Sequence, residues 1–231
     1  MSETELYRNI INSKVIDFMN GYYRPLNSDF EKFREVAENA NVPILQRDAE
    51  RLLIALAKLV RPARIIEVGT AVGYSASCLA YTLKDAEIMT FEKDHSLVEM
   101  ARHNFEHIGV EKRITVVEGD AGKLIAELPE NEKFSLAFID AAKGHYKDFF
   151  DAVMPHMNDG GVIVCDNMLF KARVVSDEYD EKRRYKTEVK KLRAFIDYLF
   201  SLPYADSSYL AVGDGTTISI IDKEKYDKQK G

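Results

Sequence analysis

Two stretches of the sequence decide the fold: FSLAFID at residues 134–140 and GVIVCDN at residues 161–167. Each is a short apolar run that ends in polar residues, Asp140 in the first and the pair Asp166 and Asn167 in the second. Apolar runs of this length are typical of parallel strands that are buried on both faces. Ligands of an open α/β sheet bind at the carboxyl ends of its strands, so we expect these three side chains to face one crevice.

The three side chains offer two carboxylates and one amide oxygen. An all-oxygen set suits a hard cation such as Mg²⁺, or another divalent cation such as Mn²⁺ or Ca²⁺, and does not suit zinc. Lys143 follows Asp140 by three residues, and a lysine beside a cation indicates a deprotonation. The alternatives are a surface lysine for Lys143 and an Asx turn for Asp166 and Asn167.

The rest of the chain from residue 64 alternates between strand and helix patterns. The predicted strands are 64–68, 87–91, 114–117, 134–139 and 162–165, and the predicted helices between them are 74–83, 96–108, 122–128 and 146–157. A helix at 182–202 and two strands at 209–212 and 216–221 follow, with the turn signal GDG at 213–215. The pattern predicts an α/β fold, Rossmann-like and doubly wound, with a mostly parallel seven-stranded sheet and a C-terminal antiparallel strand.

The first 60 residues predict an N-terminal helical extension, a cap distinct from a main unit at 61–231. The apolar residues Leu6, Ile10, Ile11 and Val15 are spaced for one helix face. SDFE at residues 28–31 resembles a capping box that opens a second helix, and residues 47–60 predict a third.

Length and composition fit one globular domain: the chain has 231 residues, 46% of them hydrophobic and 30% charged. No apolar run approaches the roughly 20 residues that span a bilayer, and the acidic start lacks the pattern of a signal peptide. Cys78 and Cys165 lie in apolar segments, which favours core thiols and a cytoplasmic protein. A net charge of −6 argues mildly against nucleic acid.

The loop EVGTAVGYS at residues 67–75 follows the first predicted strand and opens a helix. Gly69 and Gly73 permit a tight turn, but their spacing is neither that of a dinucleotide-binding loop nor that of a P-loop. Glu67 would repel a phosphate and favour a cationic ligand, for which a sulfonium with an amino acid moiety fits.

Acidic residues also end the next two predicted strands. Glu92 is placed for ribose hydroxyls, and Asp120 is placed for an adenine edge. Ordinary turn chemistry is the alternative, but it predicts glycine and does not predict an acid at four successive strand ends.

Four motifs across residues 40–221 carry a family resemblance: EVGTAVGYS, FIDAAKGHY, CDNMLF and VGDG. The chain resembles class I S-adenosylmethionine-dependent methyltransferases, and within them the metal-dependent O-methyltransferases that include catechol and caffeoyl-CoA methyltransferases. The resemblance implies a homodimer and Lys143 as the base, acting with Asp140. It implies the metal ligands Asp140, Asp166 and Asn167, and the cofactor contacts Leu45, Glu67, Gly69, Ser75, Glu92, Ala121 and Asp140, with Asp120 beside them.

Three positions depart from the plant enzymes of this family. Ala142 stands in DAAK where those enzymes have DADK, and Phe170 stands where they have Trp. Both forms resemble the bacterial tRNA 5-hydroxyuridine methyltransferases. Ile196 stands where relatives, the bacterial branch included, often have Asn, so the sequence leaves open whether a substrate contact lies near Ile196.

Residues 171–193 contain nine basic and five acidic residues, a net charge of +4. Such a segment fits contacts to a phosphate backbone, with a solvated helix face as the alternative. The first expectation is therefore methylation of 5-hydroxyuridine at a tRNA wobble position. The second is methylation of a small catechol-like molecule with vicinal hydroxyls, and the third is a cofactor-binding module without catalysis.

Overall fold

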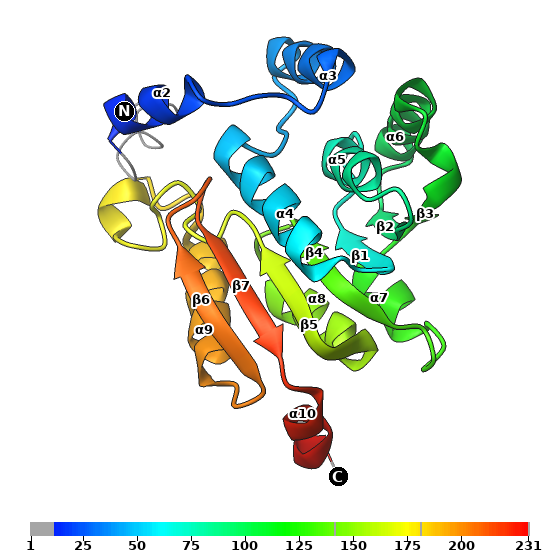
Figure 1. The fold of residues 1–231 in the computed structure, drawn as a ribbon. Coiled ribbons are helices and arrows are strands. Elements are labelled where there is room, and N and C mark those ends of the chain that lie inside the picture. The colour runs from blue at the N-terminus through cyan, green and yellow to red at the C-terminus, as the bar shows by residue number, and fades with distance from the viewer. Residues whose placement is uncertain (1–11, 141, 181, 231) are drawn as a thin grey trace.

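The computed structural model describes residues 12–140, 142–180 and 182–230. Its centre is a seven-stranded sheet with the order β3-β2-β1-β4-β5-β7-β6 (Figure 1). The parallel strands are β1 (Arg64–Val68), β2 (Glu87–Glu92), β3 (Ile114–Glu118), β4 (Phe134–Ile139) and β5 (Met157–Cys165). β7 (Thr216–Ile221) runs antiparallel to both β5 and β6 (Ala205–Leu210), which confirms the predicted fold class.

Helices cover both faces of the sheet, and each face has its own apolar core. On one face lie α3 (Ser28–Asn39), α4 (Arg47–Val60), α5 (Tyr74–Thr82) and α6 (His95–Ile108), and on the other lie α7 (Ala121–Ala126), α8 (Tyr146–Val153) and α9 (Lys186–Ser201). Leu53 of α4 packs in one core with Ile65, whereas Phe150 of α8 packs in the other with Ile66. Alternate residues of β1 therefore point to opposite cores, as expected for a strand buried on both faces.

Two predicted bounds on either side of Pro155 differ from those of the structure. The predicted helix 146–157 is too long: α8 ends at Val153, and a 3-10 turn (Met154–His156) with Pro155 follows. Proline lacks a backbone N–H and cannot continue the helix. β5 instead begins at Met157, which pairs with Phe134, so the predicted strand 162–165 is too short.

The other corrections concern polar segments. α9 begins at Lys186 and not at 182, because the Asp180 carboxylate accepts the backbone N–H groups of Arg184 and Tyr185 in a turn before it. β6 spans Ala205–Leu210 and not 209–212. The polar helix α10 (Lys223–Lys230) was not predicted.

At the N-terminal end the structure shows α2 (Ser13–Asn20), which contains Val15; Leu6, Ile10 and Ile11 lie outside the described residues. The cap of α3 is Asn27, whose side chain accepts the N–H groups of Asp29 and Phe30, so the predicted capping box at Ser28 is wrong. α4 has its predicted bounds. Cys78 and Cys165 are buried free thiols, as expected. Among the described residues, no helix has the length and apolarity to cross a membrane.

Candidate functional site

The loop between β1 and α5 approaches the sheet edge closely because two glycines take left-handed backbone conformations. Gly69 has φ 102° and Gly73 has φ 82°, values that favour glycine. A Cβ on Gly73 would lie 2.5 Å from a ring carbon of Phe105, so α6 packs directly against the loop. The backbone N–H groups of Gly69 and Thr70 both donate to the carbonyl of Phe91, which fixes the loop over the end of β2.

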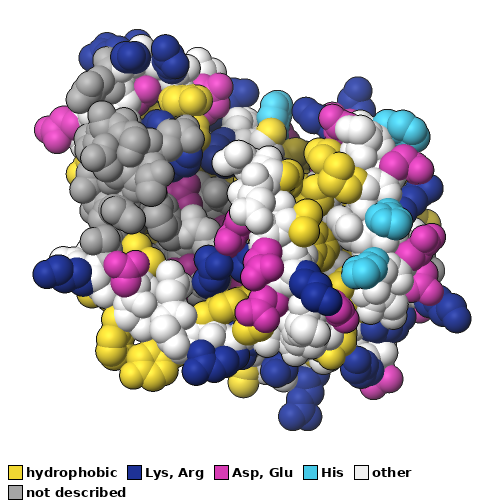
Figure 2. Space-filling model, turned by 90° about the horizontal axis from the view of Figure 1, so that it is seen from above, with side chains coloured by type: hydrophobic (Ala, Val, Ile, Leu, Met, Phe, Trp, Pro, Cys, Tyr) yellow, Lys and Arg dark blue, Asp and Glu magenta, His cyan; other side chains and the backbone are white. Residues whose placement is uncertain are grey.

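Beside this loop, at the carboxyl ends of the strands, lies a cavity of about 440 Å³, which we call the strand-end cavity. The predicted cofactor residues that line it are Gly69, Glu92, Asp120, Ala121 and Asp140. Figure 2 looks down on this edge of the sheet and shows acidic and basic side chains side by side near the middle of the face. Leu45, Glu67 and Ser75 are not among its lining residues; all three are buried close to the core.

The carboxylate of Glu92 is held in place by backbone donors. Its Oε2 accepts from the N–H of Ala71 at 3.0 Å, and its Oε1 accepts from the N–H groups of Lys93 and Asp94. Asp120 caps α7 by accepting from the N–H of Lys123. Both carboxylates therefore enter the cavity wall in fixed orientations and retain further acceptor sites.

Glu67 lies fully buried beneath the loop. Its Oε2 accepts from the Thr90 hydroxyl at 2.5 Å, whereas its buried Oε1 has no hydrogen-bond partner among the described residues. Burial raises the pKa of Glu67 to about 7. An unpaired buried acceptor beside a ligand loop fits a cofactor that carries a donor such as an ammonium group.

The predicted metal ligands come together at the ends of β4 and β5. The Asn167 amide donates to Oδ1 of Asp140 at 2.6 Å, and Asn167 holds a left-handed φ of 61°. Oδ1 of Asp166 accepts from the Thr216 hydroxyl at 3.2 Å, and the Tyr146 hydroxyl donates to the Asp166 carbonyl at 2.6 Å. A residue of α8 and a residue of β7 thus fix Asp166 from two sides.

Burial raises the pKa of both Asp140 and Asp166, and the Asp140 charge raises that of Asp166 further. Two buried carboxylates without a cation are unfavourable neighbours. In the described part of the chain, no group of three or more His, Cys, Asp or Glu side chains is arranged to hold a metal. The third oxygen of the set would be that of Asn167, after a rotation of its amide, and such a set fits a hard cation.

A second cavity, of about 620 Å³, lies on the other side of these residues, and we call it the loop cavity. Its walls include Lys143, Asn167, Phe170 and Asp214. Ala142 and His145 line both cavities, so the two adjoin. The hydrogen bond between Asp140, in the strand-end cavity, and Asn167, in the loop cavity, lies at their junction.

Lys143 enters the loop cavity with its ammonium group 5.4 Å from the ring centre of Phe170. Its charge acts on both Asp140 and Asp214, and it opposes the rise in pKa that burial causes in each. The pKa of Asp214 nevertheless rises to about 6. His145 is exposed and pairs with Asp148 at 3.1 Å.

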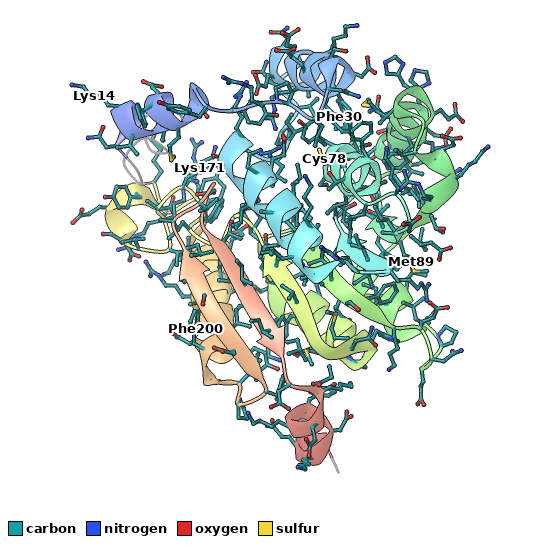
Figure 3. The ribbon with its side chains drawn as sticks, in the orientation of Figure 1. Lys14, Phe30, Cys78, Met89, Lys171 and Phe200 are labelled. Atoms are coloured by element: carbon teal, nitrogen blue, oxygen red, sulfur yellow. The ribbon has the colours of Figure 1, made fainter. Side chains whose placement is uncertain are left out.

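Two groups of the loop cavity were missed in the sequence. Asp214, in the GDG turn, accepts from the backbone N–H of Lys171 at 2.6 Å and so ties the loop after β5 to the β6–β7 connection; Figure 3 labels Lys171 near the top of the view. Arg173 is only 7% exposed and lies over the rings of Phe170 and Tyr185. The motif VGDG and the charge run were visible signals, but neither tells which side chains point inward.

Ile196 is partly buried against the core of α9 and is not among the lining residues of the loop cavity. His103 and His107 are exposed on α6, away from both cavities.

Comparisons with known proteins identify the family of the chain. A family model described as O-methyltransferase matches residues 27–221. A caffeoyl-CoA O-methyltransferase from Populus kitakamiensis is 31% identical over 185 residues, which cover 77% of this chain and 77% of that protein. A flavonoid 3',5'-methyltransferase from Vitis vinifera is 28% identical over 187 residues, again with 77% of each covered.

Solved structures share the fold. A Staphylococcus aureus structure has a TM-score of 0.81 and 29% identity, and the match covers 90% of this chain and 98% of that one. The S-adenosylhomocysteine-bound methyltransferase of Podospora anserina has a TM-score of 0.81 and 25% identity, with 92% and 97% covered. The chain therefore belongs to the O-methyltransferase family that includes the caffeoyl-CoA enzymes, and it is an S-adenosylmethionine-dependent O-methyltransferase.

Proposed function

We propose that this chain transfers a methyl group to one of two neighbouring oxygens of a small catechol-type molecule, with a divalent cation at Asp140, Asp166 and Asn167. The observation that carries the proposal is the junction of the two cavities, where Asp140 and Asn167 are 2.6 Å apart. A methyl donor in the strand-end cavity and an acceptor in the loop cavity would meet at this oxygen cluster. The names of the plant relatives favour a small acceptor over tRNA.

For the methyl donor we assign the strand-end cavity and the residues beneath it. Glu67 offers its unpaired Oε1 to the ammonium group, and Glu92 offers its fixed carboxylate to the ribose hydroxyls. Gly69 permits close approach of the backbone, and Asp120 and Ala121 border the adenine. Leu45 and Ser75, which do not line the cavity, would support it from behind.

The cation would be held by the two carboxylates and the amide oxygen, with Mg²⁺ as the first choice and Mn²⁺ or Ca²⁺ as alternatives. A cation bound there would lower the pKa of an acceptor hydroxyl. Tyr146 and Thr216 orient Asp166 through its carbonyl and its carboxylate. These two residues act through Asp166 and are positioning residues.

Lys143 is the proposed base. The acceptor oxygen attacks the methyl carbon, the carbon–sulfur bond breaks, and the hydroxyl proton passes to the amine of Lys143. This step requires the neutral amine of Lys143. Phe170 and Tyr185 form an aromatic wall, with ring centres 5.1 Å apart, against which a flat acceptor would pack.

A second candidate acceptor is the 5-hydroxyuridine of a tRNA, whose 5-hydroxyl and 4-oxo groups are also neighbouring oxygens. The observation that favours it is the placement of Lys171, Arg173 and Lys191 on the wall of the loop cavity, since these belong to the basic segment 171–193. Basic groups at the mouth of a site fit phosphate contacts of an RNA.

Labelled S-adenosylmethionine would separate the two candidates. The chain would be incubated with a catechol or with unmethylated bacterial tRNA, each with Mg²⁺ and with EDTA. We expect label in the catechol, lost with EDTA and insensitive to moderate salt. Label in tRNA alone, falling steeply with salt, would replace the small-molecule proposal by the tRNA one. Transfer that survives EDTA would overturn the metal assignment.

A further inference from the structure

A buried ion pair joins two of the N-terminal helices, and neither partner lines the strand-end cavity or the loop cavity. Nη2 of Arg34, in α3, donates to Oε2 of Glu50, in α4, at 2.5 Å. Arg34 is 4% exposed and Glu50 is 1% exposed. Charges buried this deeply lose their hydration, and an apolar pair of similar volume is often at least as stable. Stability alone therefore does not explain the pair.

The Glu50 carboxylate gathers hydrogen-bond donors from three elements. The hydroxyl of Tyr74, the first residue of α5, donates to Oε2 at 2.7 Å. The hydroxyl of Tyr23, in the connection between α2 and α3, lies 2.9 Å from Oε2 and 3.0 Å from Oε1. Arg34 of α3 is the third donor. Because a buried polar group without a partner is unfavourable, the hydroxyl of Tyr74 is held at this carboxylate.

Tyr74 matters for the site because it directly follows the loop between β1 and α5. Gly73, the last residue of that loop, has a left-handed φ of 82°, and its N–H donates to the carbonyl of Thr70 at 2.8 Å. Ser75 follows Tyr74. Burial raises the pKa of Glu67, and the hydroxyls of Thr90 and Ser75 oppose that rise. Tyr74 therefore stands between the loop beside the strand-end cavity and a hydroxyl that acts on Glu67.

α3 also holds the aromatic ring of Tyr74. The rings of Phe30 and Phe33 meet it edge to face, with ring centres 6.2 Å and 5.1 Å away. The guanidinium carbon of Arg34 lies 4.9 Å from the same ring centre. Figure 1 shows α3 above α4 and α5. The N-terminal helices thus fix the first residue of α5 both by its hydroxyl and by its ring.

Arg34 fixes a second segment, the one that leads into α4. Its Nη2 also donates to the carbonyl of Leu45 at 2.8 Å. Pro43, in the same segment, lines the loop cavity. In the first turn of α4, Oδ2 of Asp48 accepts the backbone N–H of Gly213 at 2.8 Å. The start of α4 is therefore tied to the surroundings of both cavities, and the ion pair ties it to α3.

We propose that Arg34 and Glu50 are positioning residues of the methyl-donor site, which hold the loop between β1 and α5 in the conformation that receives S-adenosylmethionine. Neither side chain contacts the donor; they act through Tyr74 and Leu45. The inference rests on the proposed function, which assigns the donor to the strand-end cavity. A loop that is already ordered before binding loses less conformational freedom when the donor binds, so the pair should raise the affinity for the donor.

The test measures the dissociation constant of S-adenosylhomocysteine by calorimetry, without metal or acceptor. Tyr74→Phe removes the hydroxyl and keeps the ring. Tyr81→Phe is the matched control on the same helix: its ring also packs against Phe30, with ring centres 5.2 Å apart, and in the described part of the chain its hydroxyl makes no hydrogen bond. We expect Tyr74→Phe to bind about threefold to tenfold more weakly, the range for one hydrogen bond, and the control to stay within about twofold.

A second comparison separates positioning from stability. Glu50→Leu leaves the charge of Arg34 buried and unpaired, which should lower the urea midpoint strongly. A double variant, Arg34→Met with Glu50→Leu, replaces the ion pair by apolar side chains and should recover much of that midpoint. We expect its affinity for S-adenosylhomocysteine to stay about tenfold or more below that of the unaltered chain, because Tyr74 and Leu45 remain without their partners. An affinity that recovers together with the midpoint would overturn the positioning role.

Methyl transfer gives a further readout that loss of stability would not produce. In Tyr74→Phe, the KM for S-adenosylmethionine should rise while kcat stays within about twofold, since no reacting atom is touched. Equal dissociation constants for Tyr74→Phe and Tyr81→Phe would overturn the inference, whether or not the double variant folds. If catechols are not methylated while the predicted binding pattern holds, only the proposed acceptor is wrong.

Discussion

The strand-end cavity and the loop cavity meet at Asp140 and Asn167 but are built in opposite ways. The strand-end cavity rests on β1 to β4, and four acidic and two basic residues line it. The loop cavity rests on the long connection after β5, where Phe170, Lys171 and Ala172 all have positive φ, and four basic and two acidic residues line it. Under the proposed function, the sheet would provide fixed acids for a cationic methyl donor, while the irregular loop would provide basic residues for the acceptor.

A substitution at the junction between the two cavities should have the largest effect on methyl transfer. Asp166→Asn removes one carboxylate of the proposed cation site and should lower kcat by more than about 100-fold, because even residues that only orient a metal ligand are worth 10–100-fold. S-adenosylhomocysteine should still bind. Asp85→Asn, at an exposed aspartate after α5, is the control and should leave kcat unchanged. Full activity of the Asp166 variant would remove the cation from the mechanism.

A pair of glycines tests how rigid the loop beside the strand-end cavity is. Gly73 and Gly109 have similar φ values, 82° and 76°, but a Cβ meets Phe105 at Gly73 and nothing within 4 Å at Gly109. Gly109→Ala should cost about 1–2 kcal/mol of unfolding free energy from the backbone alone. Gly73→Ala should cost about 1–3 kcal/mol more from overpacking and should weaken S-adenosylhomocysteine binding. Urea denaturation measures both, and equal costs would show that the loop yields to Phe105.

A substitution of Lys143 tests whether a base acts in the loop cavity. Lys143→Met should lower kcat by about 100-fold, with little change in the affinity for S-adenosylhomocysteine, if the amine accepts the acceptor proton. The loss should shrink at high pH, where hydroxide replaces the base. Lys147→Met, at an exposed lysine of α8, serves as the control. An unchanged pH profile in the Lys143 variant would assign the side chain to binding instead of proton transfer.

Glu67, which is buried beneath the loop after β1, predicts that the stability of the fold depends on pH. The pKa of Glu67 is about 7 in the folded chain against an ordinary value of 4.5, so between these values the folded state holds a proton that the unfolded state has released. Stability should therefore fall as pH rises through this window, by about 2–3 kcal/mol from this group. The unfolding free energy from urea denaturation should fall less between about pH 5 and pH 7 in Glu67→Gln than in the unaltered chain, and the difference should be about that amount. Identical slopes in the two proteins would contradict the burial of an unpaired carboxyl.

The sequence predicted the strands beside the strand-end cavity and the acids at their ends. The acids Glu92 and Asp140 follow apolar runs, so hydrophobic periodicity locates both the strand and the residue at its end. The β5 start was missed, because NDGG at residues 158–161 reads as a turn, and these four residues lie between the paired positions Met157 and Val162, where the register of β5 against β4 shifts. The turn signal is therefore kept locally, and it is the pairing of Met157 with Phe134, before the irregularity, that extends the strand.

For the loop cavity, the sequence predicted only the basic composition of one wall and not which side chains point inward. The basic run at 171–193 was visible, but the inward placement of Arg173 depends on left-handed residues after Asn167 and on stacking against Tyr185. Neither has a periodic signal. Asp214 likewise reaches the site only because β7 lies next to β5, a neighbour relation that is set by the whole sheet.

The most direct test of the central claim compares two acceptors that differ by one oxygen. Methyl transfer from labelled S-adenosylmethionine would be measured for a catechol and for the matching single phenol over a titration of Mg²⁺. The account predicts that the catechol is methylated in proportion to the bound Mg²⁺ and that the phenol is methylated far more slowly at every concentration. Equal rates for the two acceptors, or a catechol rate independent of Mg²⁺, would contradict it.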